Sequence, residues 1–191
     1  MRTWYDQSGN NNHAVQTNVA QQPKVVTSGA LVSNGGIEFA SPSKLFPTSS
    51  IGFQNTAGTV IALQDAQTTT TNKFTLGVSN SNRGIGFGVV SSKWYFTANQ
   101  HVISHGSTVS GLNLFSLIHD GTANNDNITS FLNGAQTGTA SGGANVSTLG
   151  NQIGARKDID FLTGTVKEIL IYKNDQSDKR IAIEQNIAVA Y

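Results

Sequence analysis

The 191-residue chain has no cysteine, little charge and no long apolar run. The absence of cysteine excludes disulfides and thiolate metal sites, and it leaves the cellular compartment open. The sequence shows no signal-peptide pattern, and no apolar stretch approaches the roughly 20 residues that a membrane-spanning helix needs. Charged residues make up 12% of the chain, the formal net charge is +1 and no basic stripe is present, so a nucleic-acid-binding function is excluded.

Turn-forming residues and a moderate apolar content dominate what is present. Hydrophobic residues account for 37% of the chain, which is enough for one core. Many short apolar segments separated by turn residues are typical of an all-β protein, and a chain of this length commonly forms a single β-sandwich. Because residues 2–4 look like the middle of a strand, we expect residues 1–191 to be one domain that is a module or fragment of a larger protein.

Local patterns predict particular strands and turns. Residues 59–63 are continuously apolar, which predicts a strand buried on both faces. Residues 84–89 alternate glycine with apolar residues, so a neighbouring backbone or a ligand should lie close over the glycine face, and we favour the backbone. Residues 91–92 and 133–134 are predicted hairpin turns. Glu38 lies between two large apolar residues and should point away from the core.

The end of the chain predicts the one helix. Ser177 is a favourable N-cap, and Asp178 suits the positive end of a helix dipole. Ile183, Ile187 and Tyr191 then share one stripe, which should face the sheet.

The first candidate binding region is the loop at residues 4–16, WYDQSGNNNHAVQ. A short Asp side chain hydrogen-bonds backbone groups two residues on, so Asp6 should hold the turn that follows it. Asp6, Asn10 and His13 could border a ligand groove. The alternative, which we favour, is that they only brace the loop.

Two further candidates rest on aromatic and charged residues. Trp94 and Tyr95 point to opposite faces of one strand, and the one on an exposed sheet face could stack against a sugar ring. Packing in the core is the alternative. The charged loop at residues 156–160 offers Arg156 and Asp158 as ligand contacts, with ion pairs inside the loop as the alternative.

An oxygen-rich run suggests a possible calcium site. Asp120, Asn124 and Asp126 are the candidate ligands, because Ca²⁺ takes six to eight oxygen ligands. Turns rich in asparagine also form without a metal, so this alternative stays open. The histidines have no spacing typical of zinc, and the sequence indicates no catalytic residues.

Three stretches together resemble a known superfamily. They are DQSGNNNHA near the start, HDG followed by FLNGAQTG, and FLTGTVKEILIYKNDQSDKRIAIEQNIAVAY at the end. This combination is similar to the laminin-G-like branch of the concanavalin A-like lectin and glucanase superfamily. The resemblance implies an antiparallel β-sandwich of jelly-roll type with one short C-terminal helix, and it implies glycan or cell-surface binding.

A narrower resemblance joins WYDQSGNNNHAVQ and EQNIAVAY to the catalytic domain of fungal-type α-L-arabinofuranosidases. In that family a Glu on a central strand is the nucleophile, and an Asp after an Ile-Gly-Gly turn is the acid/base. This chain has no glutamate between Glu38 and Glu168, and Arg156 follows its Ile-Gly-Ala turn. The catalytic carboxylates are therefore not matched.

These observations predict a non-catalytic glycan or cell-surface recognition module. We expect it on the surface of a phage or other virion, as in tail or capsid-decorating proteins, or on a secreted bacterial protein. One alternative is a structural virion domain that only packs against neighbouring subunits or copies of itself. The other is a glycoside hydrolase with relocated carboxylates, which would need a suitably spaced carboxyl pair over a groove.

Overall fold

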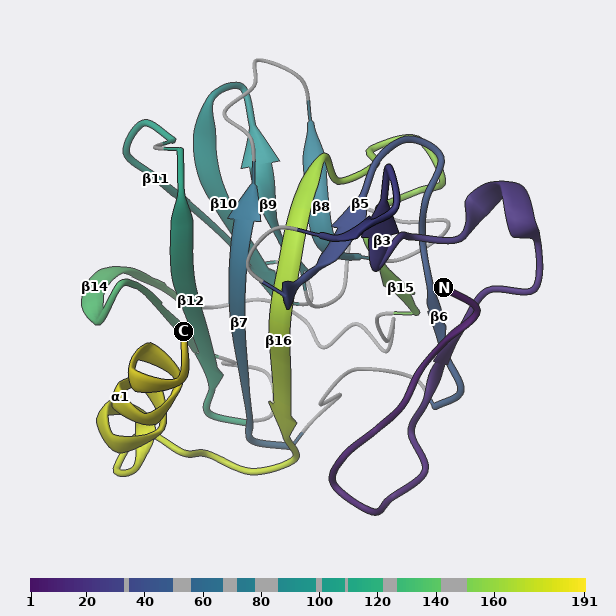
Figure 1. The fold of residues 1–191 in the computed structure, drawn as a ribbon. Coiled ribbons are helices and arrows are strands. Elements are labelled where there is room, and N and C mark those ends of the chain that lie inside the picture. Colours follow the sequence, from purple (N-terminus) through teal and green to yellow (C-terminus); the bar gives the residue numbers. More distant parts are fainter. Residues whose placement is uncertain are drawn as a thin grey trace.

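The fold is an antiparallel β-sandwich with one C-terminal helix, as the sequence predicts, seen in a computed structural model (Figure 1). The structure describes residues 1–32, 35–49, 56–66, 72–77, 86–98, 101–108, 110–121, 127–141 and 151–191. Within these residues no helix is long and apolar enough to cross a membrane.

Two large sheets form the layers of the sandwich. The five-stranded sheet has the order β11-β10-β9-β8-β15. Its strands are β8 (Lys73–Gly77), β9 (Gly86–Val90), β10 (Lys93–Ala98), β11 (His101–His105) and β15 (Gln152–Ile153). The six-stranded sheet has the order β14-β13-β12-β7-β16-β5. Its strands are β5 (Ile37–Phe39), β7 (Gly58–Ala66), β12 (Leu112–His119), β13 (Ile128–Leu132), β14 (Ala135–Ala140) and β16 (Gly164–Tyr172).

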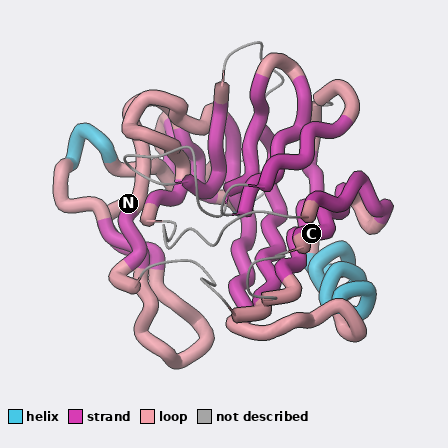
Figure 2. Tube along the Cα trace, turned by 180° about the vertical axis from the view of Figure 1, so that it is seen from behind, coloured by secondary structure: helices cyan, strands magenta, loops and turns pink. Residues whose placement is uncertain are grey.

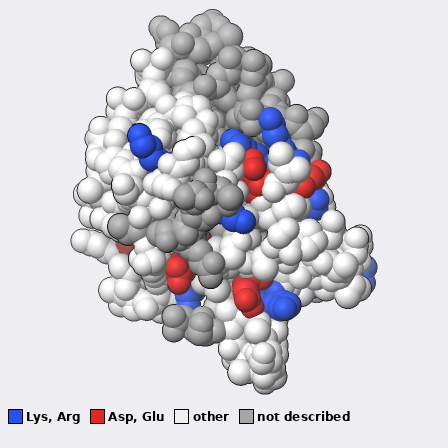
Figure 3. Space-filling view, turned by 90° about the horizontal axis from the view of Figure 1, so that it is seen from above, with Lys and Arg blue, Asp and Glu red and all other residues white. Residues whose placement is uncertain are grey.

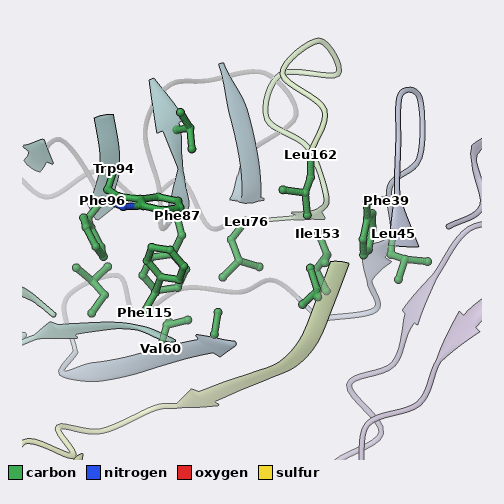
Figure 4. Close-up of a cluster of buried hydrophobic side chains, with 14 of the residues drawn as sticks. Phe39, Leu45, Val60, Leu76, Phe87, Trp94, Phe96, Phe115, Ile153 and Leu162 are labelled. Carbon is green, nitrogen blue, oxygen red and sulfur yellow. The ribbon is translucent and has the colours of Figure 1, made fainter. Parts of the chain in front are cut away.

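The main core lies between these sheets and is rich in aromatic side chains (Figure 4). Phe87, Trp94 and Phe96 project from the five-stranded sheet, and the ring of Phe115 in β12 meets all three. The predicted close backbone approach is confirmed at Gly88, where a Cβ atom would lie 2.2 Å from the carbonyl oxygen of Lys73, whereas Gly84 lies outside the described residues. The glycines of β9 thus serve packing of adjacent strands.

Both predicted hairpins are present. β9 and β10 are joined at Ser91 and Ser92, and β13 and β14 at Asn133 and Gly134. All four residues have positive φ, from 50° to 83°, as the turn that matches the twist of paired strands requires.

The outer face of the six-stranded sheet is partly covered by α1 (Arg180–Ala190), which Figure 1 shows lying beside β12. Ile187 packs on Ile61 and Leu63, which point away from the main core, so the predicted burial of residues 59–63 on both faces is confirmed. The predicted N-cap is wrong. The helix begins at Arg180 with Lys179 in the cap position, because the amide of Ser177 instead donates to Asp175 Oδ1 in the preceding turn.

Two small sheets complete the fold. The first contains β1 (Thr3–Trp4), β2 (Ala14–Val15) and β6 (Phe46–Pro47). The loop between β1 and β2 projects from the body of the molecule in Figures 1 and 2. The second is a hairpin of β3 (Val26–Thr27) and β4 (Ala30–Leu31), and a short 3₁₀ helix, η1 (Val19–Gln21), precedes it.

Candidate functional site

A groove of about 600 Å³ lies on the outer face of the six-stranded sheet, at the end that α1 leaves uncovered. It is formed by the β3–β4 hairpin, by β5, β7 and β16, and by the start of β12. Its lining residues are Thr27, Leu31, Val32, Glu38, Phe39, Ala40, Asp65, Gly111, Leu112, Thr163, Gly164, Thr165 and Lys167.

Strand register places four of these residues in one row. Thr165 in β16 pairs with Glu38 in β5 on one side and with Asp65 in β7 on the other, and Asp65 pairs with Leu112 in β12. Directly opposed residues of antiparallel strands project from the same face. Because adjacent strands lie about 4.8 Å apart, the backbones of Glu38 and Asp65 are separated by about 10 Å. The groove therefore has a carboxylate on each side of β16.

A β-bulge adds the third charge. The pairing of β16 with β7 shifts register between Val166 and Glu168, so Lys167 is an extra residue on β16. Bulges often re-aim a side chain next to a functional site. Lys167 lines the groove although it is only 9% exposed, and its stem runs past Gly36.

The charges of Lys167 and Asp65 attract each other without direct contact. Burial lowers the pKa of Lys167, and the nearby Asp65 carboxylate partly opposes that shift. No ion pair within 4.0 Å joins the two groups, and neither forms a hydrogen bond with any residue that the structure describes. The ring of Tyr191, after α1, lies 5.7 Å from the Lys167 ammonium. The Asp65 carboxylate and the Lys167 ammonium can therefore form further hydrogen bonds inside the groove.

The remaining walls of the groove contain one hydrogen-bonded carboxylate, Glu38, and exposed apolar side chains. Glu38 points away from the core, as predicted, and its carboxylate accepts a hydrogen bond from the Thr27 hydroxyl, which ties the β3–β4 hairpin to the sheet. Leu31 is 77% exposed and Leu112 is 42% exposed. The site thus combines charged hydrogen-bonding groups with apolar side chains open to solvent.

The loop between β1 and β2 is internally braced. The Asp6 carboxylate accepts hydrogen bonds from the Ser8 amide and hydroxyl and from the Asn12 amide, at 2.8–2.9 Å. These bonds, the one from the Ser8 amide first, lower the pKa of Asp6 from its ordinary value. His13 Nδ1 accepts from the Asp6 amide, whereas Asn10 bonds only Ser8. This is the bracing that the sequence favours, and a ligand role for this loop stays a prediction.

Replacing Asp6 with alanine should speed hydrogen exchange at the Ser8 and Asn12 amides by about tenfold, because each amide loses its acceptor. Because the pKa of Asp6 is lowered, its contribution is fully present above the ordinary pKa of an aspartate and is lost as the pH falls through the lower pKa of the folded state. Amide exchange followed by NMR would measure both effects. Asn10→Ala should leave these two amides protected, and unchanged exchange in Asp6→Ala would contradict the bracing role.

The prediction that Trp94 forms a sugar platform is wrong. Trp94 is 1% exposed and its ring packs against Phe115 at a centroid distance of 4.8 Å, which is the core alternative. Tyr95 points to the other face of β10 and is half-buried. Its ring meets the edge of Phe74 at 5.8 Å. Tyr95 as a ligand contact stays a prediction.

The residues predicted in the loop at 156–160 form internal contacts. Arg156 is buried, stacks 3.9 Å from the Phe74 ring centroid and donates two hydrogen bonds to Asp160. Arg156 and Tyr95, two of the predicted site residues, thus both contact the ring of Phe74. Asp158 pairs with Lys44 outside the loop. The Arg156–Asp160 pair follows the alternative of ion pairs inside the loop, whereas the Asp158–Lys44 pair does not. Ligand binding by Arg156 and Asp158 remains a prediction.

The predicted calcium loop is only partly described. The Asp120 carboxylate accepts hydrogen bonds from the amide and the side chain of Asn127. Asn124 and Asp126 lie outside the described residues. Among the residues that are described, no three His, Asp or Glu side chains cluster as a metal ion would require.

Sequence reasoning missed the groove. Asp65 and Lys167 lie 102 positions apart, and only sheet pairing brings them together. One signal was available, because Val166 and Ile169 both pack toward the main core although strict alternation would put them on opposite faces. That spacing indicates a bulge once the strand's inner face is known.

No protein-family model and no curated protein sequence matches the chain. Its fold is similar to the binding domain of botulinum neurotoxin DC in complex with rat synaptotagmin II, with TM-score 0.65 and 12% identity over 98% of this chain and 51% of that one. The binding domain of botulinum neurotoxin DC in complex with SialylT gives a TM-score of 0.64 and 14% identity, and the match covers 87% of this chain and 45% of that one. The Ruminococcus gnavus IT-sialidase CBM40 bound to α2,3-sialyllactose gives a TM-score of 0.53 and 14% identity, and the match covers 68% of this chain and 82% of that one. The chain thus spans about half the length of the toxin domains, and these likenesses establish its β-sandwich fold.

Proposed function

We propose that this domain is a non-catalytic carbohydrate-recognition module that binds its glycan in the groove between Glu38, Asp65 and Lys167. The observation that carries the proposal is the pair of opposite charges, Asp65 and Lys167, which line one sheltered groove without a hydrogen bond to a described residue. The volume of about 600 Å³ lies within the range typical of small-ligand sites. The sialyllactose and the gangliosides named for two similar structures support a sugar as ligand.

The chemistry of the groove suits a sugar ring. A sugar hydroxyl both donates and accepts, so it can meet a carboxylate and an ammonium, and each hydrogen bond to a charged group is worth about 1.5–3 kcal/mol. The apolar C–H surface of the ring would be removed from water against Leu31 and Leu112. A cell-surface glycan is met outside cells, so we place the module on a virion or on a secreted bacterial protein.

A glycan array probed with the wild type and with Asp65→Asn tests this function. We expect selective binding that falls about tenfold to a hundredfold in Asp65→Asn, because one charged acceptor is lost. Asp178→Asn is the matched control, since Asp178 is exposed in the turn before α1 and should leave binding unchanged. Circular dichroism would show that each variant is folded. A blank array from folded wild type, or full binding by Asp65→Asn, would reject the proposal.

Hydrolysis is the second candidate, favoured by the two carboxylates that flank β16 in one groove. Inverting glycosidases hold their carboxyl groups about 6.5–9.5 Å apart, and the strand spacing permits such a separation. We expect binding without release of reducing ends. Release that is lost in both Glu38→Gln and Asp65→Asn would instead make the domain an enzyme.

The alternative function, a structural domain that only packs against neighbouring subunits, explains the surface less well. A structural domain would need an apolar face for its neighbour, and α1 of the same chain already covers Ile61, Leu63 and Leu114 on the outer face of the six-stranded sheet. On the face drawn in Figure 3, acidic and basic side chains lie scattered among uncharged surface.

A further inference from the structure

We infer that the groove selects a neutral saccharide, and that one hydroxyl of this saccharide bridges the Asp65 carboxylate and the Lys167 ammonium. The inference rests on the proposed glycan-binding function and specifies its ligand class. It follows from two separate features of the groove, its net charge and the gap between these two groups.

The charge of the groove disfavours an acidic sugar. Of the described residues that line it, Glu38 and Asp65 carry two negative charges and Lys167 carries one positive charge, so the sum is −1. Register sets the two carboxylates on either side of Thr165. A sugar carboxylate or sulfate that approached Lys167 would therefore lie close to an acidic side chain, and like charges repel most strongly where water is partly excluded.

The space between the Asp65 carboxylate and the Lys167 ammonium favours one kind of chemical group. Asp65 can only accept hydrogen bonds when ionised, and the Lys167 ammonium can only donate them. A group that contacts both must donate and accept at once. A hydroxyl does so, whereas an ionised carboxylate or sulfate offers nothing to Asp65 and an alkylammonium offers nothing to Lys167.

Burial makes this pairing selective. Lys167 is about nine-tenths buried, and its stem is held against Gly36 by the bulge in β16. The ammonium therefore cannot follow a ligand freely. The same burial lowers the pKa of Lys167, because the ammonium is partly removed from water.

The expected specificity differs from that of the similar CBM40 structure, which is bound to the acidic glycan α2,3-sialyllactose. The difference makes the inference easy to test with matched glycans. Lactose against α2,3-sialyllactose is one such pair, and an array supplies neutral, sialylated and sulfated forms of many other cores.

The experiment has three steps. An array first identifies the glycan core that the wild type binds, and titration calorimetry compares its neutral and acidic forms. Deoxy analogues of the neutral form then show which hydroxyl matters. Finally, each analogue is titrated against Asp65→Asn, Lys167→Met and the double variant, with Lys173→Met as an exposed control.

We expect the neutral glycan to bind at least about tenfold more tightly than its acidic forms. One deoxy analogue should lose about tenfold with the wild type and almost nothing with Asp65→Asn or Lys167→Met, and the double variant should bind about as well as either single variant, because the bridge needs both residues. Lys173→Met should bind as the wild type does.

Three results would overturn the inference in different ways. Preference for the acidic glycan, lost in Lys167→Met, would show an anion site; the proposed function would stand and the neutral-sugar inference would fail. Additive effects of the two substitutions would refute the bridge. A blank array from folded protein would reject the proposed function and the inference together.

Discussion

Replacing Trp94 with alanine should lower the free energy of unfolding by about 3–5 kcal/mol. Trp94 is 1% exposed, and its ring packs edge-on against Phe115 from the opposite sheet. Figure 4 shows it among aromatic side chains between the two layers. Alanine would leave a cavity between two sheets whose strands restrain relaxation, so most of the lost packing would not be recovered.

Denaturant unfolding followed by circular dichroism would measure this loss. Tyr5→Ala is the control, because Tyr5 is 63% exposed and its removal should change the unfolding free energy by about 0.5 kcal/mol or less. Trp94→Phe should cost less than about 1.5 kcal/mol, since it also removes an indole N–H that has no acceptor among the described residues. A Trp94→Ala protein as stable as the wild type would contradict the core assignment.

Removing one partner of the Arg180–Glu184 ion pair should cost about 3–5 kcal/mol. Both residues belong to α1 and are buried, and Arg180 donates to Glu184 at 2.6 Å. Glu184 also accepts from the Ser116 hydroxyl of β12 at 2.5 Å, and the guanidinium stacks 3.8 Å from the Phe131 ring centroid. Arg180→Ala would leave a buried carboxylate without its cation.

The double variant Arg180→Met with Glu184→Leu separates this charge effect from packing. Apolar side chains of similar volume often replace a buried ion pair at little cost, so the double variant should be more stable than either single alanine variant. Thermal unfolding of the three variants and of exposed Lys179→Ala would measure the difference. If each single alanine variant lost less than about 1 kcal/mol, the pair would be behaving as an exposed one.

Local patterns were enough to predict the architecture. The apolar run at residues 59–63 and the alternation of glycine with apolar residues before Ser91 predict buried, closely packed strands, because a side chain's direction in a strand follows its position. Asn133-Gly134 predicts its hairpin, since few residues accept positive φ. The bracing of the loop by Asp6 could be predicted for a similarly local reason, because the amides that donate to its carboxylate lie within six residues of it.

Contacts between distant segments could not be predicted in this way. Trp94 and Tyr95 are equivalent in sequence, and only the position of the second sheet decides that Trp94 is the buried one. The helix begins at Arg180 and not just after Ser177, and one contact of the Arg180 guanidinium, the ring of Phe131 on β13, is distant in the sequence.

Strand periodicity, turn residues and apolar content are local properties, and they predict an all-β chain of many short strands with a terminal helix. The family resemblance adds that the strands form an antiparallel sandwich. Only the tertiary structure reveals the groove in which we propose that a glycan binds. Glu38, Asp65 and Lys167 come from three strands, and they share a groove because strand pairing and one bulge set their register. Register is fixed by the whole buried face of a sheet, so no single segment carries it.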